Sequence, residues 1–135
     1  EALIGAGQFE EATIVTEREF RDEASRLGRL LSIAAAQGDK AATEKLLDRY
    51  VPISTSKNHL MQVYAKAGQR QRANEVAAEF DATPFGYLSL IRAINSCLCG
   101  APFDLDATPD FAKRIKDADL PWPPRSPIDW PLKSW

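Results

Sequence analysis

The chain has 135 residues, a length typical of one domain and large enough to bury a stable core without stapling. Its 17 basic and 19 acidic side chains give a formal net charge of −2, which lacks the strong positive charge typical of dedicated nucleic-acid binders. No apolar run approaches the ~20 residues that cross a bilayer, so we expect no membrane-spanning segment.

Helical periodicity predicts paired helices through residues 1–119. We expect helices at residues 2–6 and 8–20, at 22–37 and 40–50, at 57–67 and 69–80, and at 84–99 and 109–118. Thr83-Pro84 and Thr108-Pro109 each combine a capping threonine with a first-turn proline, and they predict the starts of the last two helices. The helix at 2–6 resembles the end of a longer one, so we expect the chain to be a piece of a longer protein.

A shift of 30 residues superimposes the apolar positions of three of these helices. Leu30 coincides with Leu60 and Leu90, and the positions one, three and four residues further on also match. Such a stripe, repeated in step, is typical of stacked helical hairpins that bury their apolar sides against one another.

Glycine marks the turn inside each of the first three pairs. Gly7, Gly38 and Gly68 each follow a helical run, where a left-handed backbone favours glycine. A small residue lies five positions after each glycine, which predicts that the two helices cross closely there. Together these patterns predict an all-α fold, an α-α superhelix or solenoid of about three and a half hairpins. The predicted hairpins are 1–20, 22–50, 57–80 and 84–119, within a helical-repeat domain of residues 1–119.

Residues 120–135 differ in composition, since they hold five of the nine prolines and all three tryptophans. Proline at this density excludes helix and central strand, so we predict an extended strap. In one interpretation, Trp122, Ile128 and Trp130 cover the end of the last hairpin. In the other, the tail anchors another subunit. The predicted partner-binding residues are Trp122, Arg125, Ile128, Trp130 and Trp135.

The stretch Leu60–Gly68, followed by Ala73 and by Val76–Phe80, resembles the pentatricopeptide-repeat family and is similar to tetratricopeptide repeats. Phe85-Gly86-Tyr87 before Leu90-Ile91 resembles the start of another such repeat. The resemblance implies a mitochondrial or plastid location, and either single-stranded RNA binding or a role as a subunit of a large assembly. The spacing of 30 or 31 residues is shorter than in either family.

The resemblance also locates the positions that read bases in RNA-binding members of the family. The first position falls on Gly28, Asn58 and Leu88, and the second on Ile53 and Thr83. Only Asn58 with Thr83 offers hydrogen bonds, so we expect no sequence-specific RNA recognition. Cations on the first helix of each pair are candidates for phosphate contacts. The RNA-binding candidates are therefore Asn58, Thr83, Arg26, Arg29, Lys57, Lys66 and Arg92.

Nothing in the sequence indicates catalysis. His59 is the sole histidine, and Asp104 and Asp106 lack a further ligand set. Cys97 and Cys99 lie two apart in a predicted helix and would point to different sides, so we expect neither a disulfide between them nor a chelate. No phosphate loop, nucleophile elbow or metal motif occurs. We expect no enzyme activity, cofactor, metal or small-molecule substrate.

We therefore expect a scaffold or adaptor that binds other protein subunits of a larger assembly. The alternative is an RNA-binding segment that grips phosphates without sequence preference. A weaker alternative is a regulatory helical domain of an enzyme located upstream.

Overall fold

The computed structural model describes residues 1–135 and contains helices but no strands, which confirms the predicted all-α class. The α-helices agree with the predicted ranges to within two residues. They are α1 (Ala2–Gly5), α2 (Phe9–Glu19), α3 (Glu23–Ala36), α4 (Lys40–Tyr50), α5 (Lys57–Lys66), α6 (Arg70–Asp81), α7 (Gly86–Cys97) and α8 (Pro109–Asp117). Two 3-10 turns, η1 (Val51–Ile53) and η2 (Leu105–Ala107), lie in the connections.

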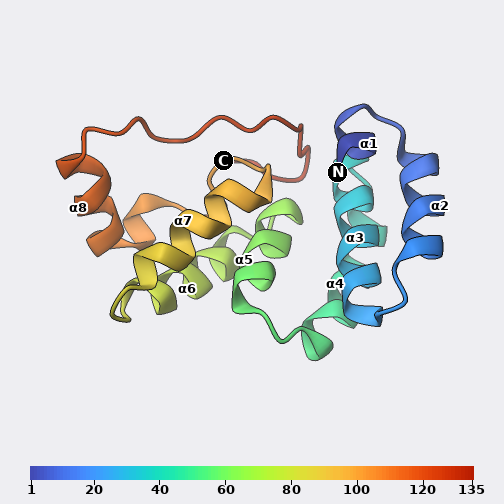
Figure 1. Cartoon of the computed structure of the whole chain (residues 1–135), viewed down its shortest axis with the longest axis horizontal. Coiled ribbons are helices and arrows are strands. Elements are labelled where there is room, and N and C mark those ends of the chain that lie inside the picture. The colour runs from blue at the N-terminus through green and yellow to red at the C-terminus, as the bar shows by residue number, and fades with distance from the viewer.

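Most helices that follow one another in the chain pack side by side, and α4 with α5 and α7 with α8 are the exceptions (Figure 1). The two most extensive helix contacts are those of α3 with α4 and of α5 with α6. Contacts of α2 with α3, of α3 with α5 and of α5 with α7 join one pair to the next. The main contacts of α8 are with α6 and η2, so the last helix lies across the end of the preceding pair.

The repeated apolar stripe lies in the core in its first two copies. Leu31 and Met61 are fully buried, and Ile33 and Val63 are buried at the next matching position. The third copy departs from this pattern at one position, because Ile91 is 42% exposed while Leu90 and Ala93 are fully buried. α7 is covered by α5 and α6, whereas α8 packs mainly on α6 and leaves this side of α7 in solvent.

The turn glycines adopt the conformation that their spacing predicts. Gly7, Gly38 and Gly68 have φ values of +73°, +73° and +76°. The small residues that follow them by five positions, Ala12, Thr43 and Ala73, are buried where each second helix packs against its partner.

Helix starts are capped partly by local side chains and partly across the fold. Asp22, Asp39 and Ser56 accept backbone N–H bonds at the starts of α3, α4 and α5. At α8 the cap comes from Asp81 of α6, whose carboxylate accepts the N–H groups of residues 110 and 111 at 3.0 and 2.8 Å. The predicted cap Thr108 makes no such bond.

The predicted start of α7 at Thr83-Pro84 is wrong, because the helix begins at Gly86. Phe85 precedes it with a left-handed φ of +62°, so the chain turns once more before the helix starts. A Cβ on Gly86 would lie 1.6 Å from the carbonyl oxygen of Phe80. This close approach to the end of α6 admits only glycine.

The expectation that Cys97 and Cys99 form no disulfide is also wrong, because the two residues are bridged. α7 ends at Cys97, and Leu98 has a left-handed φ of +53°. This turn brings Cys99 back beside Cys97. The prediction failed because it extended the helix to Cys99, and in a helix side chains two positions apart diverge.

Residues 120–135 contain no helix or strand and lead from α8 back past α7 toward α1 (Figure 1). Trp122 packs on Phe103 and Phe111, with ring centroids 5.7 and 6.1 Å apart. Further along, Ile128 and Trp130 are buried against the earlier helices. The segment therefore contacts both ends of the helical array.

None of the helices is both long enough and apolar enough to cross a membrane.

Two glycines with nearly the same φ test how closely the last residues pack against the helix turns. A Cβ on Gly68 would lie 2.3 Å from the carbonyl oxygen of Leu132, whereas a Cβ on Gly7 would meet nothing within 4 Å. We expect Gly7→Ala to lower the free energy of unfolding by about 1 kcal/mol, the cost of a left-handed alanine. Gly68→Ala should cost about 2 kcal/mol more, because the carbonyl must move.

Urea unfolding monitored by circular dichroism measures both effects. In a chain that ends at Trp130 the two substitutions should cost the same, because Leu132 is gone. Equal costs in the full chain would contradict the observed packing of Leu132 on Gly68.

Candidate functional site

A cavity of about 650 Å³ lies between α3 and α5, and it is bounded also by the η1 connection and by α7. Most of its lining side chains are polar, and many carry hydroxyl groups. The hydroxyl residues are Ser25, Ser32, Ser54, Thr55, Ser56 and Ser96. The ionisable residues of the lining are Glu1, Asp22, Arg29, His59 and Lys66, with Tyr50.

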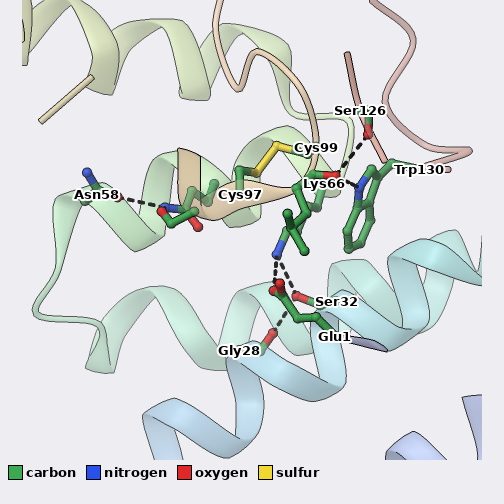
Figure 2. A network of polar contacts seen from close by, with 12 residues as sticks. Glu1, Gly28, Ser32, Asn58, Lys66, Cys97, Cys99, Ser126 and Trp130 are labelled. Atoms are coloured by element: carbon green, nitrogen blue, oxygen red, sulfur yellow. Dashed lines mark hydrogen bonds and ion pairs between the residues drawn. A yellow bond between two sulfur atoms is a disulfide. The ribbon is translucent and has the colours of Figure 1, made fainter. Parts of the chain in front are cut away.

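Lys66, at the end of α5, is the most unusual residue of this lining, since it is only 4% exposed. Its ammonium donates a hydrogen bond to Ser32 Oγ of α3 at 3.2 Å, and Ser32 in turn donates to the carbonyl of Gly28. The carboxylate of Glu1 lies 3.8 Å from Nζ, and the ring of Trp130 lies 4.8 Å away (Figure 2). Three distant segments thus meet at one buried cation.

Burial lowers the pKa of the Lys66 ammonium below its usual value of 10.5. The negative charge of Glu1 opposes this shift, and the positive charge of Arg29 adds to it. Loss of hydration is therefore the main cause, and the charged form is held by few partners.

The tail reaches this site through the turn after α7. Trp130 donates from its indole nitrogen to the carbonyl of Leu98 at 3.1 Å, and the hydroxyl of Ser126 lies 2.9 Å from the same oxygen (Figure 2). Lys133 donates to the carbonyl of Cys99 at 2.9 Å. The turn closed by the disulfide therefore presents the acceptors that position Trp130 beside Lys66.

A ladder of amides continues the polar surface along α5. Gln62 donates from Nε2 to Asn58 Oδ1 and to Ser96 Oγ, each at 2.8 Å. Asn58 donates to the carbonyl of Ser89 at 2.9 Å. These bonds join α5 to α7 and leave the Asn58 amide engaged at both of its ends.

The structure brings two of the predicted RNA-binding residues to the same cavity, Arg29 and Lys66. Arg29 lies on α3 with its guanidinium 5.0 Å from the ring of Phe20, and no carboxylate lies within ion-pair distance of it. Lys57 pairs with Glu79, and Arg26 lies 3.9 Å from Glu17.

The other two predicted RNA contacts lie elsewhere. Thr83 donates to the carbonyl of Phe80 in the turn between α6 and α7. Arg92 is exposed on α7. The predicted cations therefore do not form one continuous patch.

The predicted partner-binding residues of the tail are divided between the interior and the surface. Trp122, Ile128 and Trp130 pack on the chain's own helices, and Arg125 is exposed. Trp135 is half-buried, with the Arg70 guanidinium 5.6 Å from its ring. Among these residues, Trp130 is the one that lies beside Lys66.

Sequence reasoning missed Ser32, Gln62 and Glu1 as parts of the site. One signal was present, because Gln62 and Lys66 lie four residues apart inside the run 61–66, which is buried throughout. Two polar residues at that spacing lie on the same side of a helix, although Gln62 bonds to Asn58 and Ser96 while Lys66 bonds to Ser32. Nothing local could indicate that Ser32 or Glu1 is the partner of Lys66.

Asp104 has a structural role. Its carboxylate accepts two bonds from Arg70, at 2.7 and 3.0 Å, and one from Asn74 at 2.8 Å. The bond from Arg70 is the main reason that the pKa of Asp104 is lowered. These contacts fix the loop before α8 on α6. No three His, Cys, Asp or Glu side chains are grouped in a way that could hold a metal ion.

Comparisons of the chain with family models, with curated proteins and with solved structures find no match.

The pKa of Lys66 leads to a prediction about stability. Between the lowered pKa of the folded state and 10.5 the unfolded chain binds more protons, so the free energy of unfolding rises with pH in that window. Lys66→Met removes the buried charge and leaves Glu1 partly hydrated. We expect its stability at pH 7 to equal the parent's or to exceed it by up to about 2 kcal/mol.

Urea unfolding at pH 7, 9 and 10 tests this. The advantage of Lys66→Met should shrink as pH rises, because the parent then loses its buried charge. Lys45→Met, at an exposed position of α4, is the matched control and should stay within about 0.5 kcal/mol of the parent at each pH. A strong loss of stability in Lys66→Met at pH 7 would show that the ammonium stabilises the fold.

Proposed function

We propose that this chain is a non-catalytic scaffold of the helical-repeat type, which holds another protein as a subunit of a larger assembly. Its paired helices then form an α-α superhelix of about three and a half hairpins, similar to pentatricopeptide or tetratricopeptide repeats, with residues 120–135 as a strap. The observation that carries the proposal is the polar cavity between α3 and α5. It lies where two successive pairs meet, and exposed residues such as Ser25 and His59 are part of its lining.

The hydrogen bonds at the cavity favour binding over catalysis. Ser32 is the hydroxyl nearest to Lys66, and it gives its own proton to the carbonyl of Gly28 while it accepts from the ammonium. Lys66 therefore acts as a donor and does not activate Ser32 as a base would. His59, the sole histidine, makes no side-chain hydrogen bond.

The same contacts favour a protein ligand over RNA. The amide of Asn58 is bonded to Gln62 and to the carbonyl of Ser89, so it has little capacity left for a base edge. Thr83 bonds to its own turn. Lys57 is paired with Glu79, and Lys66 is paired with Glu1 at 3.8 Å. Among the predicted RNA-contacting cations, Arg29 and Arg92 are the two without an ion-pair partner.

RNA binding provides a direct test. We expect no binding of a fluorescein-labelled 20-nucleotide poly(U) strand, followed by anisotropy at 150 mM KCl, because the cations are paired, buried or scattered. The same titration at 50 mM KCl measures the salt dependence. Tight binding that weakens steeply with salt would instead support RNA as the ligand.

A photo-crosslinker placed at the cavity tests for a protein partner. Benzoylphenylalanine in place of Ser25, which lines the cavity, should form one dominant protein adduct in extract of the source organism, identified by mass spectrometry. The control position is Lys45 on α4, which is exposed and lies outside the cavity. Adducts that are equally abundant at both positions, or absent from Ser25, would contradict a partner at this cavity.

A further inference from the structure

The cavity between α3 and α5 contains a cation whose hydrogen-bonding capacity is largely unused. An ammonium has three N–H donors and needs acceptors for them when it is removed from water. Lys66 is 4% exposed, and Ser32 Oγ is the one acceptor that makes a short hydrogen bond with its ammonium. The Trp130 ring lies over part of it, and Glu1 Oε1 pairs with it at the longer distance of 3.8 Å. A buried ammonium with one short hydrogen bond and one distant ion pair can accept a closer anionic partner.

A second cation faces the same cavity. Arg29 lies one helical turn before Ser32 on the neighbouring part of α3, and it has no carboxylate partner in the chain. The charge of Arg29 is felt at Lys66, where it lowers the pKa. The two cations therefore repel each other across the cavity, and an anion between them would relieve this repulsion.

The balance of charge selects the kind of anion. Asp22 keeps its negative charge at the start of α3, where it accepts the N–H of Ser25, and the charges that act on the Lys66 ammonium are those of Glu1 and Arg29. The group formed by Lys66, Arg29 and Glu1 therefore carries one net positive charge. A single carboxylate neutralises this charge, whereas a phosphate dianion would leave an excess of negative charge beside Glu1.

The chain itself shows which group suits the position. The anion nearest to Lys66 is the carboxylate of Glu1, which is held loosely at 3.8 Å by a side chain that is 31% exposed (Figure 2). A carboxylate is therefore compatible with the space beside Lys66. The cavity, at about 650 Å³, is much larger than one carboxylate and can hold several residues of a peptide.

We propose that this cavity binds an acidic segment of the partner protein, with one aspartate or glutamate side chain seated between Lys66 and Arg29. The hydroxyl of Ser25 and the other hydroxyl groups of the lining then bond the neighbouring peptide groups. The proposal rests on the scaffold function above, since it takes the occupant to be a protein. The incoming carboxylate lies beside Glu1, whose negative charge opposes its binding.

The test uses the full chain and a defined probe, hexaglutamate with blocked ends, at 150 mM KCl. Binding is measured by calorimetry and by tryptophan fluorescence, because Trp130 lies 4.8 Å from the Lys66 ammonium. The matched probe is blocked hexaglutamine, which has the same shape without charge. We expect hexaglutamate to bind and hexaglutamine not to bind.

Three variants assign the binding to the cavity. Lys66→Met should weaken hexaglutamate binding at least about tenfold, because it removes the buried charged donor. Glu1→Gln should strengthen binding about threefold or more, because a competing charge is removed while the side-chain shape is kept. Lys45→Met removes the same charge from α4, outside the cavity, and should change binding by less than twofold.

Glu1→Gln keeps the proposal testable even if Lys66→Met folds poorly, since it removes no buried group. The proposed position of the carboxylate would be wrong if Glu1→Gln left the affinity for hexaglutamate unchanged. It would also be wrong if Lys66→Met and Lys45→Met lowered that affinity equally. No binding of hexaglutamate to either the parent or Glu1→Gln would overturn it as well.

Two further probes distinguish the source of the anion. Glutarate that binds as tightly as hexaglutamate would assign the cavity to small carboxylates and overturn a partner segment. If inorganic phosphate binds more tightly than glutarate and hexaglutamate, the proposal that the bound group is a carboxylate is wrong. If none of these probes binds but the crosslinked adduct at Ser25 still forms, the acidic-segment proposal is wrong and the scaffold proposal stands. RNA binding, by contrast, would contradict the scaffold whatever the peptide does.

Discussion

The close packing of helices within each pair, and of one pair on the next, is the constraint on which the rest of the structure depends. Ala35, Ala65, Ala73, Ala77 and Ala93 have no exposed surface, so helix backbones approach one another closely at these positions. A single amphipathic helix pair can bury only part of its apolar surface by itself. Each pair therefore packs on the next, and the molecule extends along the chain direction (Figure 1).

The junction between α3 and α5 shows what this packing leaves open. Within the pairs, small and apolar residues fill the space between helices. Between α3 and α5 polar side chains take their place, and a cavity remains. Lys66 lies at this junction, and a leucine there would fill the space without any loss of hydration. A lysine removed from water contributes little to stability, which fits the proposal that binding is the reason for its presence.

The last sixteen residues form a second constraint that acts on the ends of the helix pairs. Pro131 lies beside the turn at Gly38, and Leu132 lies beside the turn at Gly68. The carbonyls of Leu98 and Cys99 accept hydrogen bonds from this segment. Its proline-rich backbone, which lacks many N–H donors, can cross these turns without needing a sheet or helix partner. The tail thus connects helices that are far apart in sequence, and it places Trp130 at Lys66.

The sequence was sufficient for the class of the fold and for most helix limits, because both depend on local order. Apolar periodicity, the turn glycines and the caps Asp22, Asp39 and Ser56 act within a few residues, so reading them in sequence locates the helices. The same reading failed at α7, where Gly86 meets the carbonyl of Phe80, and at Cys97 and Cys99, where a left-handed Leu98 reverses the chain.

The candidate site was accessible to sequence reasoning only in part. Lys66 and Arg29 could be singled out as cations on first helices, but their burial, their shared cavity and the contacts of Lys66 with Ser32, Glu1 and Trp130 depend on segments up to 129 residues apart. Asp81 capping α8 is a contact of the same kind. Local patterns determine which segments become helices, because helix formation is governed by neighbours in the chain. Which charges become buried, and which partners they meet, depends on how those helices pack.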